Sequence, residues 1–205
     1  MFLEDVSTRN LRKKGFLNST VLVGRDMLLL FQIDKDVVLD NHRHPHTQLG
    51  YCFDGEFDFE VEGEHFFVTK GFSYLLKSKI FHSAVATTNY YAMDIKRVLA
   101  DGDPQNKISQ DVFKCILQNE SHVLCNVNVG DSLIQKISFK QADSSILIEL
   151  DTTRKNYVIV SKPCKFTVGD FSQQLEPMAI YSFDSDKSNI NIKIDCQAEV
   201  VLITY

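Results

Sequence analysis

Histidines gather in one stretch of the sequence at spacings that suit metal binding. His42, His44 and His46 alternate with other residues, Gln48 continues the spacing, and His82 follows further along. In an extended strand, side chains at even spacing point to one face, so His42, His44, His46 and Gln48 would face the same way. Polar groups directed into a barrel interior need a partner, and a divalent metal supplies one because imidazole nitrogens bind Fe, Co, Ni, Cu or Zn. The stretch therefore predicts a metal site with an open position for substrate.

A histidine-rich surface turn is the alternative interpretation of this stretch. Added tags usually sit at a terminus, whereas these histidines lie inside a strand pattern, which favours the metal site. His46 has the parity of a rival ligand or of an acid/base group. We interpret His65 and His122 as ordinary polar residues.

The elements that must position these side chains are predicted to be strands. Short β-branched or aromatic runs separated by turn residues are typical of an all-β sandwich or barrel. Residues 57–62 alternate strictly between apolar and acidic, Gly63-Glu64 makes a turn, and residues 65–68 return, which predicts a hairpin. Further strands are expected at residues 20–24, 28–33, 51–53, 72–76 and 90–95, and in the second half at 134–139, 146–150, 157–160, 180–183, 190–194 and 200–203.

The strongest break in the sequence is Asp101-Gly102-Asp103-Pro104, which combines turn residues with a helix breaker. After it, Ser109 could cap a helix through residue 117 with its apolar residues on one face. We therefore predict two domains, residues 1–104 and residues 105–205, with a short helical linker at the start of the second.

The two halves resemble each other weakly when they are compared at a constant offset of 106 residues. Tyr51 then meets Tyr157 and Gly63 meets Gly169, which indicates duplication of one β-domain. The same offset places four residues that make no plausible metal-ligand set opposite His42, His44, Gln48 and His82, namely Ile148, Leu150, Arg154 and Ser188. The second domain is predicted to keep the fold without the metal.

Composition and charge exclude several classes of function. The net charge of −5 argues against a nucleic-acid partner, since binding to phosphates rests on clustered Lys and Arg. No apolar stretch approaches the length of a membrane span, so we expect no membrane partner. Five cysteines without CxxC spacing suit a reducing compartment, which predicts a cytoplasmic protein. A small-molecule partner is the default, and a homodimer is left open.

The spacing of the predicted ligands resembles the two motifs of the cupin family. The first motif is G-x5-H-x-H-x3,4-E-x6-G, and the sequence matches it from position 36 to position 55, with Asp36 at the first Gly and Gln48 at the Glu. The second is G-x5-P-x-G-x2-H-x3-N, in which Gly71 and His82 match, while Lys77, Lys79 and Ala86 replace Pro, Gly and Asn. The resemblance implies jelly-roll barrels and a metal held by His42, His44, Gln48 and His82.

Within the cupins, the sequence resembles bicupin isomerases of the bacilysin pathway (BacB-like) and of aeruginosin pathways (AerE-like). The features that carry this resemblance are His42-x-His44-x3-Gln48-x-Gly50, Gly55-Glu56, His82-Ser83-Ala84, and Met93-Asp94-Ile95-Lys96-Arg97 followed by Ala100-Asp101. BacB-like enzymes carry metal motifs in both halves, whereas this chain carries one, and its length also favours the aeruginosin branch. The resemblance implies an all-β bicupin with a degenerate second barrel.

The resemblance also implies a reaction, the allylic isomerisation of a dihydro-4-hydroxyphenylpyruvate in secondary metabolism and antibiotic biosynthesis. One divalent metal (Fe, Co, Ni, Mn or Zn) would act as a Lewis acid on an anionic 2-oxo acid substrate. His46, Lys77 and Arg97 are our candidates for proton transfer or carboxylate binding, with Tyr51 and Lys79 as weaker ones. Tyr51 has the opposite strand parity to the ligands and is expected to face outward.

Two other functions are compatible with the same motifs. A cupin dioxygenase acting on a small organic acid would use an iron site, although Gln48 replaces the carboxylate such sites contain. A non-catalytic ligand-binding cupin would usually carry an effector domain, and the sequence contains no helix-turn-helix pattern. Oxygen consumption and metal content distinguish these functions from the isomerase.

Overall fold

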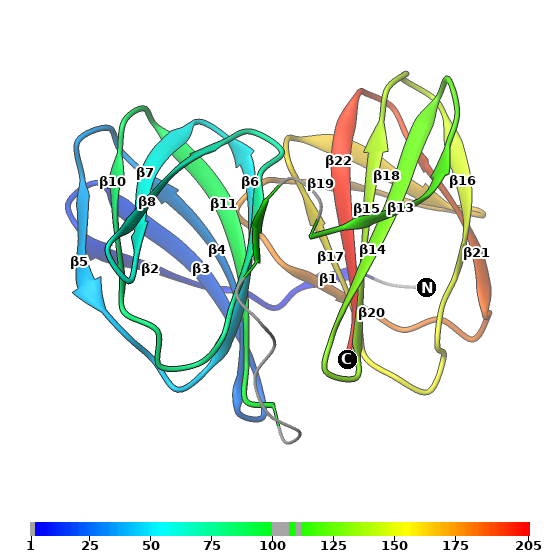
Figure 1. The fold of residues 1–205 in the computed structure, drawn as a ribbon. Coiled ribbons are helices and arrows are strands. Elements are labelled where there is room, and N and C mark those ends of the chain that lie inside the picture. The colour runs from blue at the N-terminus through cyan, green and yellow to red at the C-terminus, as the bar shows by residue number, and fades with distance from the viewer. Residues whose placement is uncertain (1–2, 100–106, 110–111) are drawn as a thin grey trace. The chain divides into compact units, whose positions relative to one another are not determined.

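The computed structural model describes residues 3–99, 107–109 and 112–205, and these residues form strands, turns and loops (Figure 1). The chain divides into two compact units. The N-terminal unit is Thr8–Val112, and the C-terminal unit is Phe113–Tyr205 together with residues 3–7. The predicted boundary between residues 104 and 105 lies outside the described residues. Within the described part of the chain, no helix is long and apolar enough to cross a bilayer.

The N-terminal unit contains two antiparallel sheets. Its seven-stranded sheet has the order β12 (Lys107–Ser109), β9 (Ser73–Leu76), β6 (Thr47–Asp54), β11 (Tyr90–Arg97), β4 (Asp26–Ile33), β3 (Phe16–Val23) and β2 (Thr8–Lys13). Its four-stranded sheet has the order β5 (Val38–His42), β10 (His82–Ala86), β7 (Glu56–Val61) and β8 (Glu64–Thr69).

The C-terminal unit repeats this arrangement strand for strand. Its seven-stranded sheet has the order β1 (Leu3–Asp5), β20 (Tyr181–Phe183), β17 (Asn156–Val160), β22 (Ala198–Thr204), β15 (Ser132–Phe139), β14 (His122–Val129) and β13 (Lys114–Gln118). Its four-stranded sheet has the order β16 (Ser145–Glu149), β21 (Asn189–Ile194), β18 (Cys164–Val168) and β19 (Phe171–Leu175). Two units with one strand order are the outcome expected of a duplicated domain.

The edge strands β1 and β12 are exchanged between the repeats. β1 precedes the strands of the N-terminal unit in the chain, yet it pairs with β20 of the C-terminal unit. β12 precedes the strands of the C-terminal unit, yet it pairs with β9 of the N-terminal unit. In chain order the two repeats are β1–β11 and β12–β22. The first strand of each repeat therefore forms the edge of the seven-stranded sheet built mainly by the other repeat.

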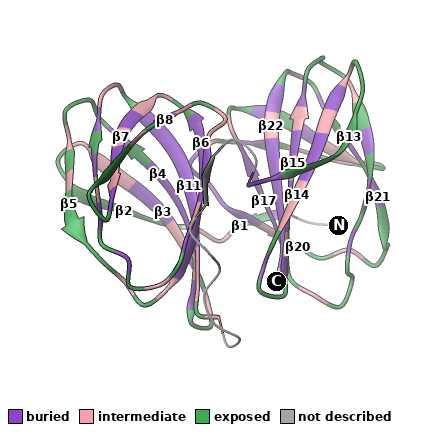
Figure 2. Cartoon of the chain, in the orientation of Figure 1, coloured by how far each residue is buried: buried purple, intermediate pink, exposed green. Residues whose placement is uncertain are grey.

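Each unit buries a core between its two sheets. In the N-terminal unit, Leu29 and Phe31 of β4 pack in one cluster with Phe57 and Phe59 of β7. Each such side chain contributes about 1.5–3 kcal/mol when it leaves water. Figure 2 shows the resulting pattern, in which β6 and β11 are buried along most of their length and β2 and β5 are mainly exposed.

The predicted hairpin is confirmed as β7 and β8, whose partners run from Glu56↔Thr69 to Val61↔Glu64. Glu62 and Gly63 connect the two strands with φ values of 51° and 87°. Two consecutive positive φ values are the signature of the tight turn that matches the twist of a hairpin. The alternating sequence thus faces the core on one side and water on the other, as predicted.

The predicted helical linker at residues 109–117 is wrong. Ser109 lies in β12, residues 110 and 111 are outside the described residues, and Lys114–Gln118 forms β13. β13 pairs with β14, where Cys115 faces Cys125 and Leu117 faces Leu124. A neighbouring strand contributed by a later part of the chain thus overrides a weak local helix pattern, and the aliphatic residues at this position are equally suited to a strand.

Candidate metal centre and its cavity

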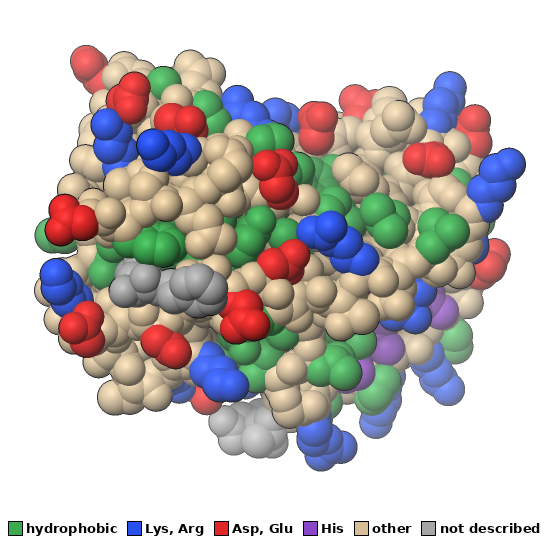
Figure 3. Space-filling model, turned by 180° about the vertical axis from the view of Figure 1, so that it is seen from behind, with side chains coloured by type: hydrophobic (Ala, Val, Ile, Leu, Met, Phe, Trp, Pro, Cys, Tyr) green, Lys and Arg blue, Asp and Glu red, His purple; other side chains and the backbone are tan. Residues whose placement is uncertain are grey.

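Three histidines converge in the N-terminal unit. His42 ends β5 and His82 begins β10, and the two residues are direct partners across these strands. His44 lies in the connection that follows β5. One ring nitrogen of each lies within 4.8 Å of those of the other two. The imidazoles therefore form a triad that could hold a metal ion. Figure 3 shows histidine side chains gathered on part of one face of the molecule.

Backbone carbonyls fix which nitrogen of each imidazole faces the triad. The Nδ1 atoms of His42, His44 and His82 lie 2.8, 3.0 and 3.0 Å from the carbonyl oxygen of a residue two positions away. A carbonyl oxygen only accepts hydrogen bonds, so Nδ1 carries the proton and Nε2 keeps its lone pair. An imidazole anchored in this way is ready to bind a metal through Nε2.

Gln48 adds an oxygen to the three nitrogens. Its Oε1 lies 2.5 Å from Nε2 of His44, and its amide nitrogen donates to Asp94 Oδ2 at 3.0 Å and to Tyr74 Oη at 3.3 Å. Since Nδ1 of His44 carries the proton, Nε2 and Oε1 both present electron pairs to each other. Such a pair is repulsive unless a cation is shared, so the donor set fits a divalent metal.

The electrostatic surroundings keep His44 and His82 neutral. Burial lowers the pKa of His44 to about 4, helped by the positive charge of Lys96. Burial likewise lowers the pKa of His82 to about 4, and the neighbouring His42 and His44 act in the same direction. Imidazoles that are neutral at pH 7 can donate their lone pairs without first releasing a proton.

A second layer of side chains holds Gln48 in place. Tyr74 Oη donates to Asp94 Oδ1 at 2.8 Å, so that the two oxygens of Asp94 accept from Tyr74 and Gln48. Burial raises the pKa of the Asp94 carboxyl. Gly50 makes room for Tyr74, because a Cβ atom at position 50 would lie 2.4 Å from Tyr74 Oη. Gly50 of the predicted motif thus serves the hydrogen-bond network around Gln48.

The site opens onto a cavity of about 310 Å³. His42, Gln48 and His82 line it together with six aromatic rings, those of Phe16, Phe31, Phe57, Phe59, Tyr74 and Tyr90. The charged residues that line it are Arg12, Asp94 and Lys96. The cavity volume lies at the lower end of the range for small-molecule sites, and the mixture of aromatic walls with a few polar groups is typical of them.

The single strand predicted for residues 42–48 is wrong. β5 ends at His42 and β6 begins at Thr47, so that His42 and Gln48 come from different sheets. Pro45 lies between them and lacks the N–H that a continued strand ladder needs. The chain turns there from one sheet to the other, and His46 falls outside the triad that His42, His44 and His82 form.

The predicted catalytic residues lie outside the cavity lining. Arg97 Nε contacts Asp26 Oδ2 at 2.8 Å. Lys77 is exposed, and His46 is partly buried with its ring 5.8 Å from that of His44. The roles of His46, Lys77 and Arg97 stay predictions. Tyr51, expected to face outward, has a side chain that is completely buried. It does not line the cavity.

Sequence reasoning did not single out Arg12, Tyr74, Asp94 or Lys96 for the site. A signal was present in β11, where Asp94 and Lys96 alternate with apolar residues of a strand that is otherwise buried. Arg12 carried no such signal, because it lies in the wholly exposed strand β2. It reaches the cavity from the edge of the seven-stranded sheet, where β2 pairs with β3.

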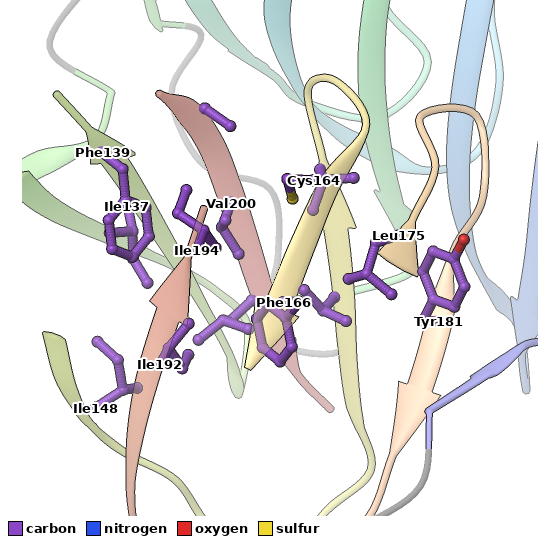
Figure 4. Packing of buried hydrophobic residues seen from close by; sticks show 14 of the residues in the cluster. Ile137, Phe139, Ile148, Cys164, Phe166, Leu175, Tyr181, Ile192, Ile194 and Val200 are labelled. Atoms are coloured by element: carbon purple, nitrogen blue, oxygen red, sulfur yellow. The ribbon is translucent and has the colours of Figure 1, made fainter. Parts of the chain in front are cut away.

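The C-terminal unit fills the corresponding space with aliphatic side chains. β16 and β21 occupy the positions that β5 and β10 hold in the N-terminal unit. They direct Ile146, Ile148, Ile190 and Ile192 into the core, and Figure 4 shows Ile192 between Ile148 and Phe166. Within the described ranges, His42, His44 and His82 make up the one group of three or more potential metal-binding side chains.

Comparison with known proteins assigns the fold. Residues 29–94 match the family model of the cupin domain. The matched residues lie within the N-terminal unit, which thus resembles a cupin domain. A comparison with curated protein sequences found no match.

Solved structures resemble the whole chain in fold. AerE from Microcystis aeruginosa has a TM-score of 0.71 at 13% identity, covering 98% of this chain and 97% of AerE. The bacterial pirin YhhW from Escherichia coli, solved in complex with nickel(II), has a TM-score of 0.74 at 12% identity, with 99% and 97% covered. GK1651 from Geobacillus kaustophilus has a TM-score of 0.72 at 10% identity, with 99% and 94% covered. The predicted all-β bicupin fold is confirmed, and so is the resemblance to AerE at the level of the fold. The histidine triad lies in the N-terminal unit.

Proposed function

We propose that the protein is a metal-dependent isomerase that moves a carbon–carbon double bond in a small, unsaturated 2-oxo acid. The substrate we propose is a dihydro-4-hydroxyphenylpyruvate, in a pathway of the aeruginosin or bacilysin type and in the cytoplasm. One observation carries the proposal. One ring nitrogen from each of His42, His44 and His82 lies within 4.8 Å of the others, and the Gln48 oxygen lies 2.5 Å from His44 Nε2. An aromatic-walled cavity beside them is also lined by two cationic side chains.

The proposed ligands are His42, His44, His82 and Gln48. A divalent metal bound by them supplies a Lewis acid that stabilises negative charge on a keto oxygen. Iron, cobalt, nickel, manganese and zinc are the candidates, and nickel is the first to test because the YhhW structure contains it. Gln48 is neutral where the cupin motif has a carboxylate, so the centre keeps more positive charge for an anionic substrate.

The proposed reaction is balanced without a redox partner. One C–H bond breaks, the double bond shifts along the allylic system, and one C–H bond forms at the far carbon. The proton that leaves equals the proton that returns, so neither oxygen nor a nicotinamide is consumed. The chain contributes aromatic walls that orient a ring and exclude water, and a buried Asp94 that holds the Gln48 amide in position.

The test offers dihydro-4-hydroxyphenylpyruvate to the metal-loaded protein under nitrogen and follows the absorption of the conjugated product. We expect the absorption to grow without oxygen and to be abolished by His82→Ala. A reaction that requires and consumes oxygen would replace the isomerase with a dioxygenase. Binding of the acid with a flat trace would instead identify a ligand-binding cupin.

A further inference from the structure

We infer that Arg12 and Lys96 form a carboxylate-binding subsite in the cavity of the cupin domain. Arg12 reaches the cavity from β2 and Lys96 from β11, and both line it together with His42, Gln48 and His82. The inference rests on the proposed function and narrows its substrate class to acids with one carboxylate and a flat, unsaturated body.

The first argument is the balance of charge. Arg12 and Lys96 are two cations in a cavity whose lining contains one carboxylate, that of Asp94. Lys96 Nζ lies 4.0 Å from Asp94 Oδ2, which is the limit of an ion pair, and its side chain is only 15% exposed. A buried cation is costly unless an anion compensates it. A bound carboxylate provides that compensation.

The second argument is that Asp94 is already engaged by neutral donors. Tyr74 Oη donates to one of its oxygens and the Gln48 amide donates to the other. The negative charge of Asp94 is therefore shared among Tyr74, Gln48 and Lys96. The cavity has an excess of positive charge that a monocarboxylate would neutralise, whereas a neutral ligand would leave it in place.

The third argument is that Arg12 is held in position. With the amide of Asn18 oriented so that its nitrogen donates to the Asn10 carbonyl at 3.2 Å, its oxygen accepts from Arg12 Nε at 2.7 Å. Asn18 is completely buried, so its side chain is a fixed hydrogen-bond partner for Arg12. An anchored guanidinium loses little further freedom when it binds a carboxylate.

The walls define the rest of the ligand. Phe31, Phe57, Phe59 and Tyr90 present rings to the same cavity, and Phe57 and Tyr90 lie edge to face at 4.3 Å between centroids. Aromatic walls favour a flat hydrocarbon ring over a sugar or a phosphate ester, which would need many hydrogen bonds. The subsite therefore selects a ring-bearing monocarboxylate.

The experiment measures binding rather than turnover. Two probes of one shape are titrated calorimetrically into the metal-loaded protein: 3-phenylpropanoate, which carries a carboxylate, and 3-phenylpropanamide, which does not. We expect the acid to bind at least about tenfold more tightly than the amide, since a charge-assisted contact contributes about 1.5–3 kcal/mol. Lys96→Met should abolish this preference, and Arg12→Gln should reduce it several-fold.

Matched variants control for lost charge and for misfolding. Lys70→Met and Arg25→Gln each remove one exposed positive charge outside the cavity lining, and should leave the preference unchanged. Amide binding reports on the integrity of the cavity in every variant. Equal affinity for acid and amide in the parent protein would overturn the inference, as would an undiminished preference in Lys96→Met and Arg12→Gln. Loss of amide binding together with acid binding in those variants would also overturn it.

The outcome separates this inference from the proposed function. If the protein prefers the acid through Lys96 and Arg12 but isomerises no substrate, the carboxylate subsite is supported and the isomerase function is contradicted. If the Lys96→Met variant isomerises the substrate with an unchanged KM, the isomerase function is supported and the carboxylate subsite is contradicted.

Discussion

At the scale of single residues, the hydrogen bonds on Nδ1 decide what the histidines can do. Each backbone carbonyl that accepts from Nδ1 leaves Nε2 with a free electron pair for a metal. One ring nitrogen from each histidine already lies within 4.8 Å of the other two. The imidazole at the start of β10 is the most buried of the three, with 5% exposure. Removal of this side chain takes away one ligand and opens the site to water.

We predict that His82→Ala lowers metal affinity by at least about tenfold, since loss of even a supporting group typically costs 10–100-fold. The matched change is Ser188→Ala, which lies in the other unit outside any group of potential ligands among the described residues. Metal content after dialysis against a weak chelator measures both. Equal loss in the two variants would contradict a single-site protein.

The same histidine should make the stability of the metal-free protein depend on pH. The pKa of His82 is about 4 in the folded chain and 6.5 in the unfolded one, so the unfolded chain binds the proton more readily between these values. The free energy of unfolding therefore falls as the pH drops from 6.5 toward 4, by up to about 3 kcal/mol at 1.36 kcal/mol per pKa unit. Urea titrations at pH 7 and pH 4 should show a smaller difference in His82→Gln than in the parent protein.

The histidines could be found from the sequence, whereas Asp94 and Lys96 left only the alternation in β11 as a signal and Arg12 left none. Imidazoles at short spacing have few other uses, so their type alone indicates a metal. A lysine or an aspartate has many uses, and its function depends on which strands become neighbours. Lys96 faces Gln48 only because β11 pairs with β6 across more than forty intervening residues. That pairing is a property of the whole sheet rather than of any local pattern.

At the scale of elements, the turns follow the cupin pattern even where the sequence departs from it. The pattern has glycine at four positions, which hold Asp36, Gly55, Gly71 and Lys79 in this chain. All four have positive φ, at 66°, 85°, 83° and 61°. The local motif therefore specifies a backbone conformation, and two L-residues adopt it at some cost.

We predict that Lys79→Gly stabilises the protein by up to about 1.5 kcal/mol. A left-handed conformation costs an L-residue about 1–2 kcal/mol, and the extra entropy of glycine in the unfolded chain offsets about 0.5–1 kcal/mol of the relief. Lys70→Gly is the control, because Lys70 lies in a turn outside the positive-φ set. Urea unfolding should rank Lys79→Gly above Lys70→Gly, and the reverse order would show that no strain is stored at position 79.

Gly50 offers a second test at the scale of elements. A methyl group in Gly50→Ala would collide with the Tyr74 ring, whose nearest atom lies 2.0 Å from the place that the new Cβ would occupy. Since Tyr74 and Gln48 share Asp94, displacement of the ring should disturb the Gln48 oxygen and lower metal affinity by about 10–100-fold. Gly63→Ala has open space around its Cβ and should leave metal affinity unchanged. Unaltered metal affinity in Gly50→Ala would show that the position of Tyr74 does not influence metal binding.

At the scale of the whole molecule, the weak repeat in the sequence predicted two similar domains but not how their edges are completed. The strand order of one unit is reproduced in the other, while the histidine triad of one has no counterpart among the described residues of the other, which packs isoleucines in its core. The sequence gives no local signal for the exchange of β1 and β12, because the three residues of such a strand do not indicate which strand they will pair with. The exchange makes residues 3–7 part of the C-terminal unit, whereas the histidine triad lies in the N-terminal unit.

This exchange predicts an effect at a distance along the sequence. Leu3 is 2% exposed and belongs to the core cluster of the C-terminal unit, so Leu3→Ala should destabilise that unit by about 2–5 kcal/mol. Leu11→Ala removes the same atoms from a side chain that is 70% exposed and should cost little. Hydrogen exchange in Leu3→Ala should accelerate in β17 and β20, while metal affinity stays at the parent value. Faster exchange in β3 and β4 instead would mean that the N-terminal segment supports the domain it precedes rather than the one it pairs with.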